Sequence, residues 1–356
     1  MLTLPALRYP VYFVSKELHR FKDLIDNGGL VANSEEAFKR CMSGADVWSV
    51  QSYVLLKQRG LDIYLTDHYV PDAICVVPHN FLMVRDLPFN SYVVACRTDS
   101  ARPAICEIRS VMNPLAIVDS DDHFLPHWPQ PILIPRDRTR GSRVENLDFK
   151  GHPRNLAGPF KTPEFLASLR EIGMQFLFDS NAAVEQVDPR NQFLSWADYS
   201  QSDVVLAVRN LTEYDFGLKP AVKLVNSWMA GVPAILGPEP AYQALRKSEL
   251  DYIEVITAED ALRELKRLKE SPSLYQQMVE NGLQRAKECS ADVVAQAWYQ
   301  FLNGPVMRGY ERWKQAGWID RKIGRPVRFF IRVIKHKQND KHHRYHRDNG
   351  YRPVTG

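Results

Sequence analysis

Two lysines four residues apart are the strongest chemical signal in this chain. Lys219 and Lys223 flank the first turn of a helix predicted over PAVKLVNSWMAG, and their spacing puts both on one face of that helix. A helix N-terminus offers free N–H groups and the positive end of a dipole, so two adjacent ammonium groups complete a cradle for a diphosphate. Cations placed there would stabilise a diphosphate leaving group without a metal ion. The alternative is ordinary solvated charge.

Further candidate contacts to a diphosphate lie in loops at the ends of predicted strands. Gly151 opens the loop GHPRN after the strand in VENLDFKG, where glycine permits close backbone approach and Arg154 could bind a phosphate with two hydrogen bonds. Arg209 ends the strand VVLAVR and is either a phosphate contact or a structural ion pair. Asn226 and Gly237 are the candidate contacts to a ribose or sugar hydroxyl.

Candidates for a catalytic base follow predicted strands of the first half. His79 comes after AICVVP, and Asp122 and His123 come after LAIVD, which begins at Leu115. An imidazole or carboxylate at such an edge could accept the proton of an acceptor hydroxyl, although such residues also cap turns. Asp119-Ser120-Asp121 mimics a metal-binding D-x-D motif, but we expect no metal site and no cofactor.

The elements that must position these residues alternate between strand and helix on both sides of one Pro- and Arg-rich stretch, Pro126–Arg143. This alternation predicts an α/β protein of two doubly wound, Rossmann-like domains. We place the domains at 1–135 and 141–305, with a C-terminal helix and basic tail at 306–356. Ligands of such sheets bind outside the carboxyl ends of the strands, so a cleft between the domains is the expected site.

The second half resembles the donor-binding domain of GT-B glycosyltransferases, the superfamily that includes the family 4 enzymes and glycogen phosphorylase. The resemblance covers about 130–305 and rests on the turn Ala230–Ile235 (AGVPAI), on ILIPRD before the linker, and on the strand and loop at Gly151. It implies the GT-B fold, a nucleotide-diphosphate sugar as donor, and donor contacts from the loops named above. Asn226 stands where many retaining members carry a ribose-binding glutamate, so the resemblance leaves the stereochemical outcome open.

Composition adds a basic C-terminus to this picture. The 356 residues carry a net charge of +4, but residues 306–356 hold 14 Lys/Arg against 4 Asp/Glu, a net +10, which leaves −6 for the rest. Within 321–352, basic residues interleave with aromatic and aliphatic ones, a pattern that suits an anionic membrane surface. A helix packed back across the first domain is the alternative, and nucleic acid is the least favoured partner. The five cysteines form no CxxC pair, which favours buried thiols in the reducing cytoplasm. No stretch approaches the length of a transmembrane span, so we expect any binding to the inner face of a membrane to be peripheral.

These observations favour a glycosyltransferase that moves a sugar from a nucleotide-diphosphate sugar to a carbohydrate or lipid-linked hydroxyl. Synthesis of a cell-surface polysaccharide or glycolipid is the expected setting. A nucleotide-sugar epimerase of the same architecture and a non-catalytic scaffold with a GT-B-like fold are the alternatives.

Overall fold

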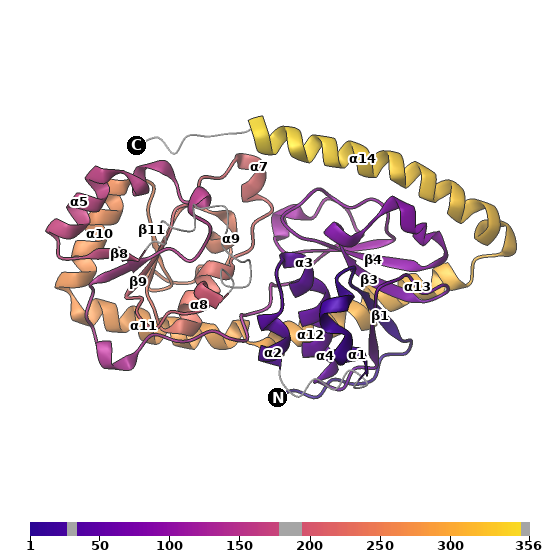
Figure 1. Ribbon diagram of the computed structural model, residues 1–356, viewed down its shortest axis with the longest axis horizontal. Helices are drawn as coiled ribbons and strands as arrows, with labels where there is room; N and C mark the ends of the chain where they lie inside the picture. The colour runs from indigo at the N-terminus through magenta and orange to yellow at the C-terminus, as the bar shows by residue number, and fades with distance from the viewer. Residues whose placement is uncertain (27–33, 178–193, 350–356) are drawn as a thin grey trace. The chain divides into compact units, whose positions relative to one another are not determined.

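The chain forms two compact α/β units (Figure 1). The computed structural model describes residues 1–26, 34–177 and 194–349. Unit 1 combines Met1–Trp128 with Ala291–Asn349, and unit 2 spans Pro129–Ser290. The prediction of two doubly wound domains therefore agrees with the two units, although the boundaries differ from those placed by sequence.

Unit 1 is built on a parallel sheet with the strand order β2-β1-β3-β4-β5-β6 among the described residues. The inner strands β3 and β4 are buried along their whole length, as expected of strands covered on both faces. The strands are β1 Val11–Val14, β2 Ile63–Thr66, β3 Ile74–Pro78, β4 Tyr92–Arg97, β5 Ile108–Val111 and β6 Asp122–Phe124.

One predicted strand of unit 1 is wrong. Residues 115–119 form no strand, because Asn113 caps a 3-10 turn at Pro114–Ala116 and the apolar side chains that follow are exposed. The strand at this place in the sheet is β5, which the sequence analysis missed. Its Arg109 and Ser110 are buried polar residues, so the segment lacks the apolar pattern of a buried strand.

The helices of unit 1 come from both ends of the chain. They are α1 Lys22–Asp26, α2 Ser34–Lys39, α3 Gly44–Asp46, α4 Ser52–Lys57, α12 Ala291–Phe301, α13 Met307–Lys314 and α14 Arg325–Asn349, with a π-helical turn at Val47–Gln51 before α4 and another at Asp320–Gly324 before α14.

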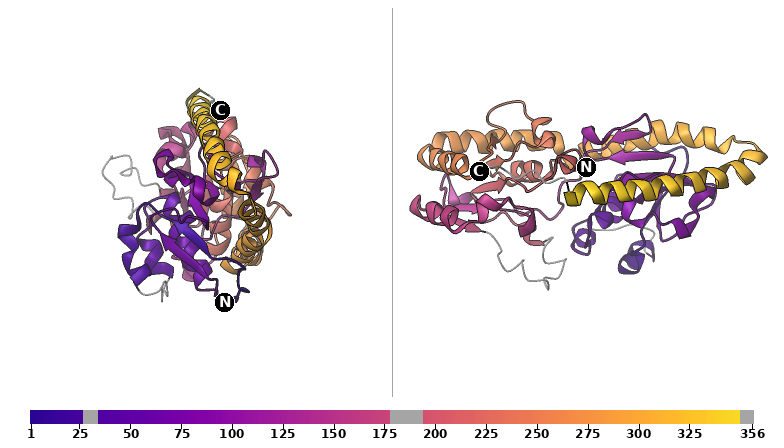
Figure 2. Two further views of the ribbon diagram at one scale, coloured as in Figure 1. Left: turned by 90° about the vertical axis from the view of Figure 1, so that its right-hand side faces the viewer. Right: turned by 90° about the horizontal axis from the view of Figure 1, so that it is seen from above.

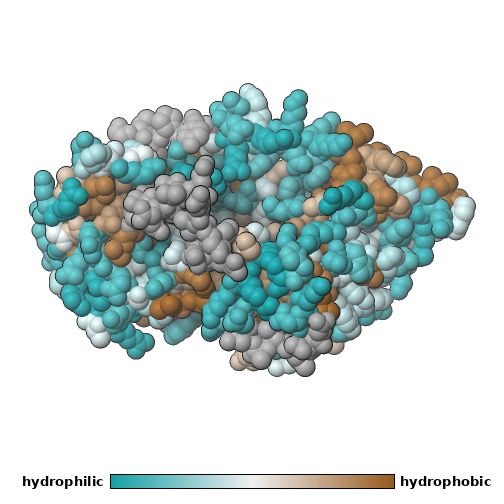
Figure 3. All heavy atoms as spheres, viewed as in Figure 1, coloured by the Kyte–Doolittle hydropathy of each residue, from teal (hydrophilic) through white to brown (hydrophobic). Residues whose placement is uncertain are grey.

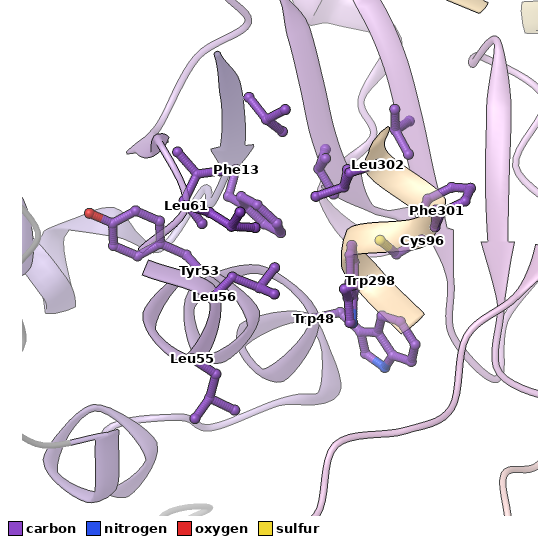
Figure 4. Close-up of a cluster of buried hydrophobic side chains, with 14 of the residues drawn as sticks. Phe13, Trp48, Tyr53, Leu55, Leu56, Leu61, Cys96, Trp298, Phe301 and Leu302 are labelled. Carbon is purple, nitrogen blue, oxygen red and sulfur yellow. The ribbon is translucent and has the colours of Figure 1, made fainter. Parts of the chain in front are cut away.

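The core explains why residues 291–305 belong to unit 1 and not to the second domain, where the sequence analysis placed them. Trp298 of α12 packs 5.8 Å from Phe13 and 5.9 Å from Trp48 between ring centroids, and Phe301 and Leu302 join the same cluster (Figure 4). Burying these large side chains among residues of the first fifty stabilises the return of the chain.

The helix α14 also packs on unit 1 (Figure 2). Phe329 is buried with its ring centroid 5.7 Å from that of Phe89, and the Asn339 amide donates to the carbonyl of Arg102 at 2.8 Å. One alternative for the basic C-terminus was a helix packed back across the first domain. The described part of the tail, residues 306–349, has this arrangement. Among the helices that the structure describes, none combines the length and the apolar character needed to span a bilayer.

Unit 2 is a second parallel sheet, with the order β11-β10-β9-β7-β8 among the described residues. Its strands are β7 Asn146–Asp148, β8 Gln175–Leu177, β9 Val204–Ala207, β10 Ala234–Leu236 and β11 Ile253–Glu254. Its helices are α5 Pro163–Glu171, α7 Glu213–Phe216, α8 Val222–Ala230, α9 Pro240–Gln243, α10 Ala258–Glu270 and α11 Pro272–Ala286.

The Pro- and Arg-rich stretch is fixed to unit 2 by one buried carboxylate. Asp203, fully buried, accepts hydrogen bonds from Arg136 and Arg140 at 2.7 Å each and from two backbone N–H groups at 2.9 Å. Ile134 pairs with Asp198 in an isolated bridge. The segment ILIPRD, most of which the sequence analysis placed in the first domain, is therefore part of unit 2 and not of the first sheet.

Candidate functional site

Both sheets have the same kind of topological switch point, where the strand order reverses. In unit 2 the reversal lies between β7 and β9, and in unit 1 it lies between β1 and β3. The loops that leave the carboxyl ends of the strands diverge at such a point and leave a crevice for a ligand. The loop at Gly151 follows β7 and Arg209 follows β9, so the structure brings these two candidates to the switch point of unit 2.

Lys223 reaches the same place from the first turn of α8. Its Nζ donates a hydrogen bond to the carbonyl of Lys150 and lies 4.9 Å from the centroid of the Phe149 ring. A Cβ added to Gly151 would come within 2.7 Å of that Nζ. The glycine therefore gives the ammonium group access to the loop after β7, which a side chain would deny it.

The ammonium group of Lys223 stands in an electrostatically unfavourable position. Burial lowers the pKa of Lys223 from its ordinary 10.5 to about 7, and the charges of Arg209 and Lys219 act in the same direction. Glu239 and Asp148 oppose this shift without cancelling it. A lysine with a pKa this far below its ordinary value, clustered with other cations, indicates a site for an anion.

The start of α8 adds hydrogen-bond donors to these cations. The helix begins at Val222, and its N-cap residue Ala221 makes no side-chain capping bond. Lys219 precedes this turn, is half-buried, and lies close enough to Lys223 to affect its pKa. The structure therefore brings together Lys219, Lys223, Arg209 and the loop at Gly151. Their contact with a diphosphate stays a prediction.

Arg209 is in an ion pair that the sequence analysis left open as an alternative. Its Nε donates to Oε1 of Glu239 at 2.7 Å, and Nη2 contacts Oε2 of the same carboxylate. Both residues are buried, and Glu239 follows β10 at the start of α9. Glu239 was missed, although an acid two residues after the candidate Gly237 was a usable signal. Phosphate binding by Arg209 stays a prediction.

The other donor candidates lie around this cluster with different exposure. Arg154 is exposed in the 3-10 turn Pro153–Asn155, in the loop after β7. Gly237 follows β10 directly, and its N–H donates to the carbonyl of Ala207 at 3.1 Å. Asn226 is buried, bonds the Tyr199 hydroxyl, and has a side-chain oxygen without a hydrogen-bond partner in the described part of the chain. That oxygen could accept a hydrogen bond from a sugar hydroxyl.

In unit 1, His79 lies at the switch point of the sheet, directly after β3. Its Nε2 is 3.4 Å from Oδ1 of Asp340, which comes from α14. The interaction with His79 helps hold the pKa of Asp340 below its ordinary value. An imidazole oriented by a carboxylate is a suitable general base. The sequence offered no signal for Asp340, because 261 residues separate it from His79.

Asp122 and His123 lie in β6 and do not follow a strand as expected. The buried carboxylate of Asp122 accepts from Arg109 Nε at 2.5 Å and pairs with Arg102 at 2.9 Å. His123 is half-buried with its ring centroid 5.4 Å from that of Phe301, and burial lowers its pKa. Asp122 is therefore held in ion pairs with Arg109 and Arg102, which is a structural role. This favours His79 as the base among the three candidates.

His336 lies beside His79 and Asp340, and one potential ligand atom from each of the three lies within 4.8 Å of the others. The backbone N–H of Ala104 donates to Nδ1 of His336 at 3.3 Å. In the neutral ring Nε2 then carries the proton and has no lone pair for a metal ion. The geometry thus favours a cluster in which Asp340 lies 3.4 Å from His79 Nε2 and 3.8 Å from His336 Nε2 over a metal centre.

No family model and no curated protein matches this chain. Among solved structures, it is similar to sucrose-phosphate synthase from Thermosynechococcus elongatus, at a TM-score of 0.51 and 9% identity, over 85% of this chain and 100% of that chain. It is also similar to the Anabaena protein HepE in complex with UDP and glucose (TM-score 0.48, 8% identity, 83% of this chain and 99% of that chain). A third similar structure is AviGT4, a glycosyltransferase involved in avilamycin A biosynthesis (TM-score 0.42, 12% identity, 75% and 90%). The likeness to sucrose-phosphate synthase, together with two parallel α/β units, confirms the predicted fold class: this chain has the GT-B fold.

Proposed function

We propose that this protein is a glycosyltransferase that uses a nucleotide-diphosphate sugar as donor. The observation that carries the proposal is the cluster of Lys223, Arg209 and Gly151 at the switch point of unit 2. A half-buried lysine beside other cations is costly for the folded protein unless an anion uses it. A diphosphate is the anion that fits a helix start, two lysines and a glycine loop together.

In this proposal the cations act on the leaving group. The bond between the sugar anomeric carbon and the diphosphate oxygen breaks, and negative charge grows on that oxygen. Lys219 and Lys223 stabilise the charge, so no metal ion is required in the proposed reaction. Asn226 and the turn at Gly237 are proposed to contact the ribose or the sugar, and Arg154 the phosphates.

The acceptor side is proposed to use His79. The acceptor hydroxyl forms the new bond to the anomeric carbon, and His79 takes its proton in an inverting reaction. Because Nε2 faces Asp340, Nδ1 is the nitrogen proposed to accept that proton. Asp340 orients the imidazole and stabilises the cation that results. A carbohydrate or lipid-linked hydroxyl is the proposed acceptor class.

We further propose hexosyl transfer in the synthesis of a cell-surface polysaccharide or glycolipid, in the cytoplasm at the inner face of a membrane. The net +10 charge of residues 306–356 supports that location. Residues 350–352 of the proposed membrane segment 321–352 lie outside the described residues.

A thermal-shift panel tests the donor half of the proposal. UDP, GDP, ADP, CMP and their sugars are added to the wild-type protein and to Lys223→Ala. A ligand that binds only the folded state raises the melting temperature, and a concentration of 100 times Kd adds about 2.7 kcal/mol. We expect one nucleoside diphosphate series to act on the wild type and to lose at least tenfold in affinity on the variant. Equal shifts in both proteins would remove Lys223 from the site.

The two alternative functions predict different results with the same protein and ligands. An epimerase would convert the bound donor to its epimer with no acceptor present, which chromatography of the nucleotide sugar detects. A non-catalytic scaffold would show no shift with any nucleotide at millimolar concentration.

A further inference from the structure

The helical segment 318–334 has two faces of different character. One face packs on unit 1 through Phe329, which is 3% exposed, and through Arg332, which pairs with Glu107. The buried residue Arg325 places its guanidinium carbon 3.4 Å from the centroid of the Trp313 ring. These contacts fix the rotation of the helix about its axis.

The opposite face carries large apolar side chains that remain exposed. Phe330, Ile331 and Ile334 are 63%, 61% and 60% exposed, and Val327 is 51% exposed. Their spacing of three or four residues places them on one side of α14. The helical residues before α14 extend the row. They are Trp318 and Ile319, each 69% exposed, and Ile323, which is 56% exposed. Figure 3 shows hydrophobic side chains gathered over the first part of α14.

Exposed basic residues accompany this row. Lys322 lies within it, Lys335 and Lys337 follow Ile334, and Lys341 continues the row four residues after Lys337. Apolar groups flanked by lysines along one helix face fit the boundary between lipid head groups and acyl chains, where the ammonium groups meet anionic lipids. Nucleic acid would use the lysines but leave the isoleucines and Phe330 in water.

We propose that this outer face, defined by Trp318, Ile319, Ile323, Val327, Phe330, Ile331 and Ile334, docks in the plane of an anionic lipid bilayer. This inference rests on the membrane location proposed above and specifies which face of the protein contacts the membrane. Because this face lies in unit 1 and the donor cluster in unit 2, its test is independent of donor chemistry. The charge distribution favours an anionic bilayer as the occupant. Residues 306–356 carry a net charge of +10, whereas the rest of the chain carries −6.

Vesicle flotation of the full-length protein tests the proposal. Two vesicle compositions are used, pure phosphatidylcholine and phosphatidylcholine with about 30% phosphatidylglycerol. The triple variant Phe330→Ser, Ile331→Ser, Ile334→Ser removes the centre of the row and leaves Phe329 in place. The matched control is Leu115→Ser, Ile117→Ser, Val118→Ser, which removes exposed apolar groups (62%, 46% and 68%) from elsewhere on unit 1.

We expect the wild type and the control to float with the anionic vesicles. The triple variant should lose about 100-fold in partition coefficient, the loss that removing three partly exposed apolar side chains from the interface implies. Lys335→Gln, Lys337→Gln, Lys341→Gln should lose about fivefold per lysine on anionic vesicles and nothing on neutral ones. All variants should keep the melting temperature of the wild type.

Flotation of the triple variant like the wild type would overturn the proposal. A wild type that does not float but forms a dimer, which the triple variant dissociates, would also overturn it, because a second copy would then occupy this face. A wild type that does not float but binds a 30-mer single-stranded DNA tightly would overturn it as well. The nucleotide thermal shift is measured on the same samples. Flotation without a nucleotide shift would leave this surface standing and remove the transferase proposal.

Discussion

The low pKa of Lys223 links donor binding to proton uptake. At pH 8 a lysine with a pKa of about 7 is about 10% protonated, whereas the bound diphosphate requires the charged form. Binding should therefore take up about 0.9 proton at pH 8 and only about 0.1 at pH 6. The apparent Kd should rise about tenfold for each pH unit above 7, because an ever smaller fraction of the protein carries the charge.

Isothermal titration calorimetry with the nucleotide sugar that gives the largest thermal shift measures the uptake directly. The slope of the apparent enthalpy against the ionisation enthalpy of the buffer gives the number of protons taken up. The diphosphate of a nucleotide sugar is esterified at both ends and does not titrate near pH 7, so the protons belong to the protein. Lys223→Arg is the matched variant, because guanidinium keeps its charge throughout this range.

We expect Lys223→Arg to abolish the uptake at pH 8 and Lys219→Arg to retain it. Uptake below about 0.2 proton in the wild type at pH 8, or equal uptake in wild type and Lys223→Arg, would refute the assignment of the proton to Lys223. The same lysine affects stability in the opposite sense. Between about pH 7 and the ordinary pKa of 10.5 the unfolded chain binds more protons than the native protein, so this contribution to the free energy of unfolding rises with pH.

Four further variants test other parts of the structure. Gly151→Ala should weaken donor binding about tenfold with little loss of stability, because the new Cβ would displace the flexible end of Lys223; titration calorimetry measures it. His79→Ala should lower kcat for sugar transfer at least about 100-fold with donor affinity unchanged, and Asp340→Asn should give an intermediate loss. Asp203→Ala should cost about 3–5 kcal/mol in thermal or urea unfolding, since it leaves the buried Arg136 and the half-buried Arg140 without this carboxylate.

The chain provides a control variant for the His79 test and a pH dependence that checks the Asp203 test. His68 and Asp67 form an exposed pair at 2.7 Å, so His68→Ala should leave kcat unchanged if the His79 effect depends on its position. For Asp203, burial opposes ionisation, but the arginine and backbone hydrogen bonds still hold its pKa below the ordinary value. Its stabilising effect is therefore present above the ordinary carboxyl pKa and lost as the pH falls through the lowered one. A pH-independent loss in Asp203→Ala would contradict this account.

Local sequence was sufficient wherever a segment carried its own pattern. The buried runs at β3, β4 and β9 are continuous apolar stretches between turn residues, which allow few other structures. The two lysines beside α8 were found by spacing alone, and the loop at Gly151 by its place after a strand. The order of such segments predicted two α/β domains, and the resemblance carried by the turn at Ala230–Ile235 implied the GT-B fold.

Polar segments were placed wrongly or missed, because their burial depends on distant partners. Arg109 is tolerated in β5 because the carboxylates of Asp122 and Asp119 meet it, so no apolar pattern marks that strand. The apolar stretch that begins at Leu115 is no strand, since Asn113 and Pro114 turn the chain and the side chains of Leu115, Ile117 and Val118 are exposed.

The sequence by itself determined the two α/β series, the cationic start of α8 and the basic, apolar-interleaved composition of the C-terminal segment. Only the tertiary structure decided that α12 returns to unit 1, that Glu239 pairs with Arg209, and that Asp340 meets His79. The physical reason is that backbone periodicity and spacing act within one segment, whereas the free energy of burying a charge depends on which partner the fold brings to it.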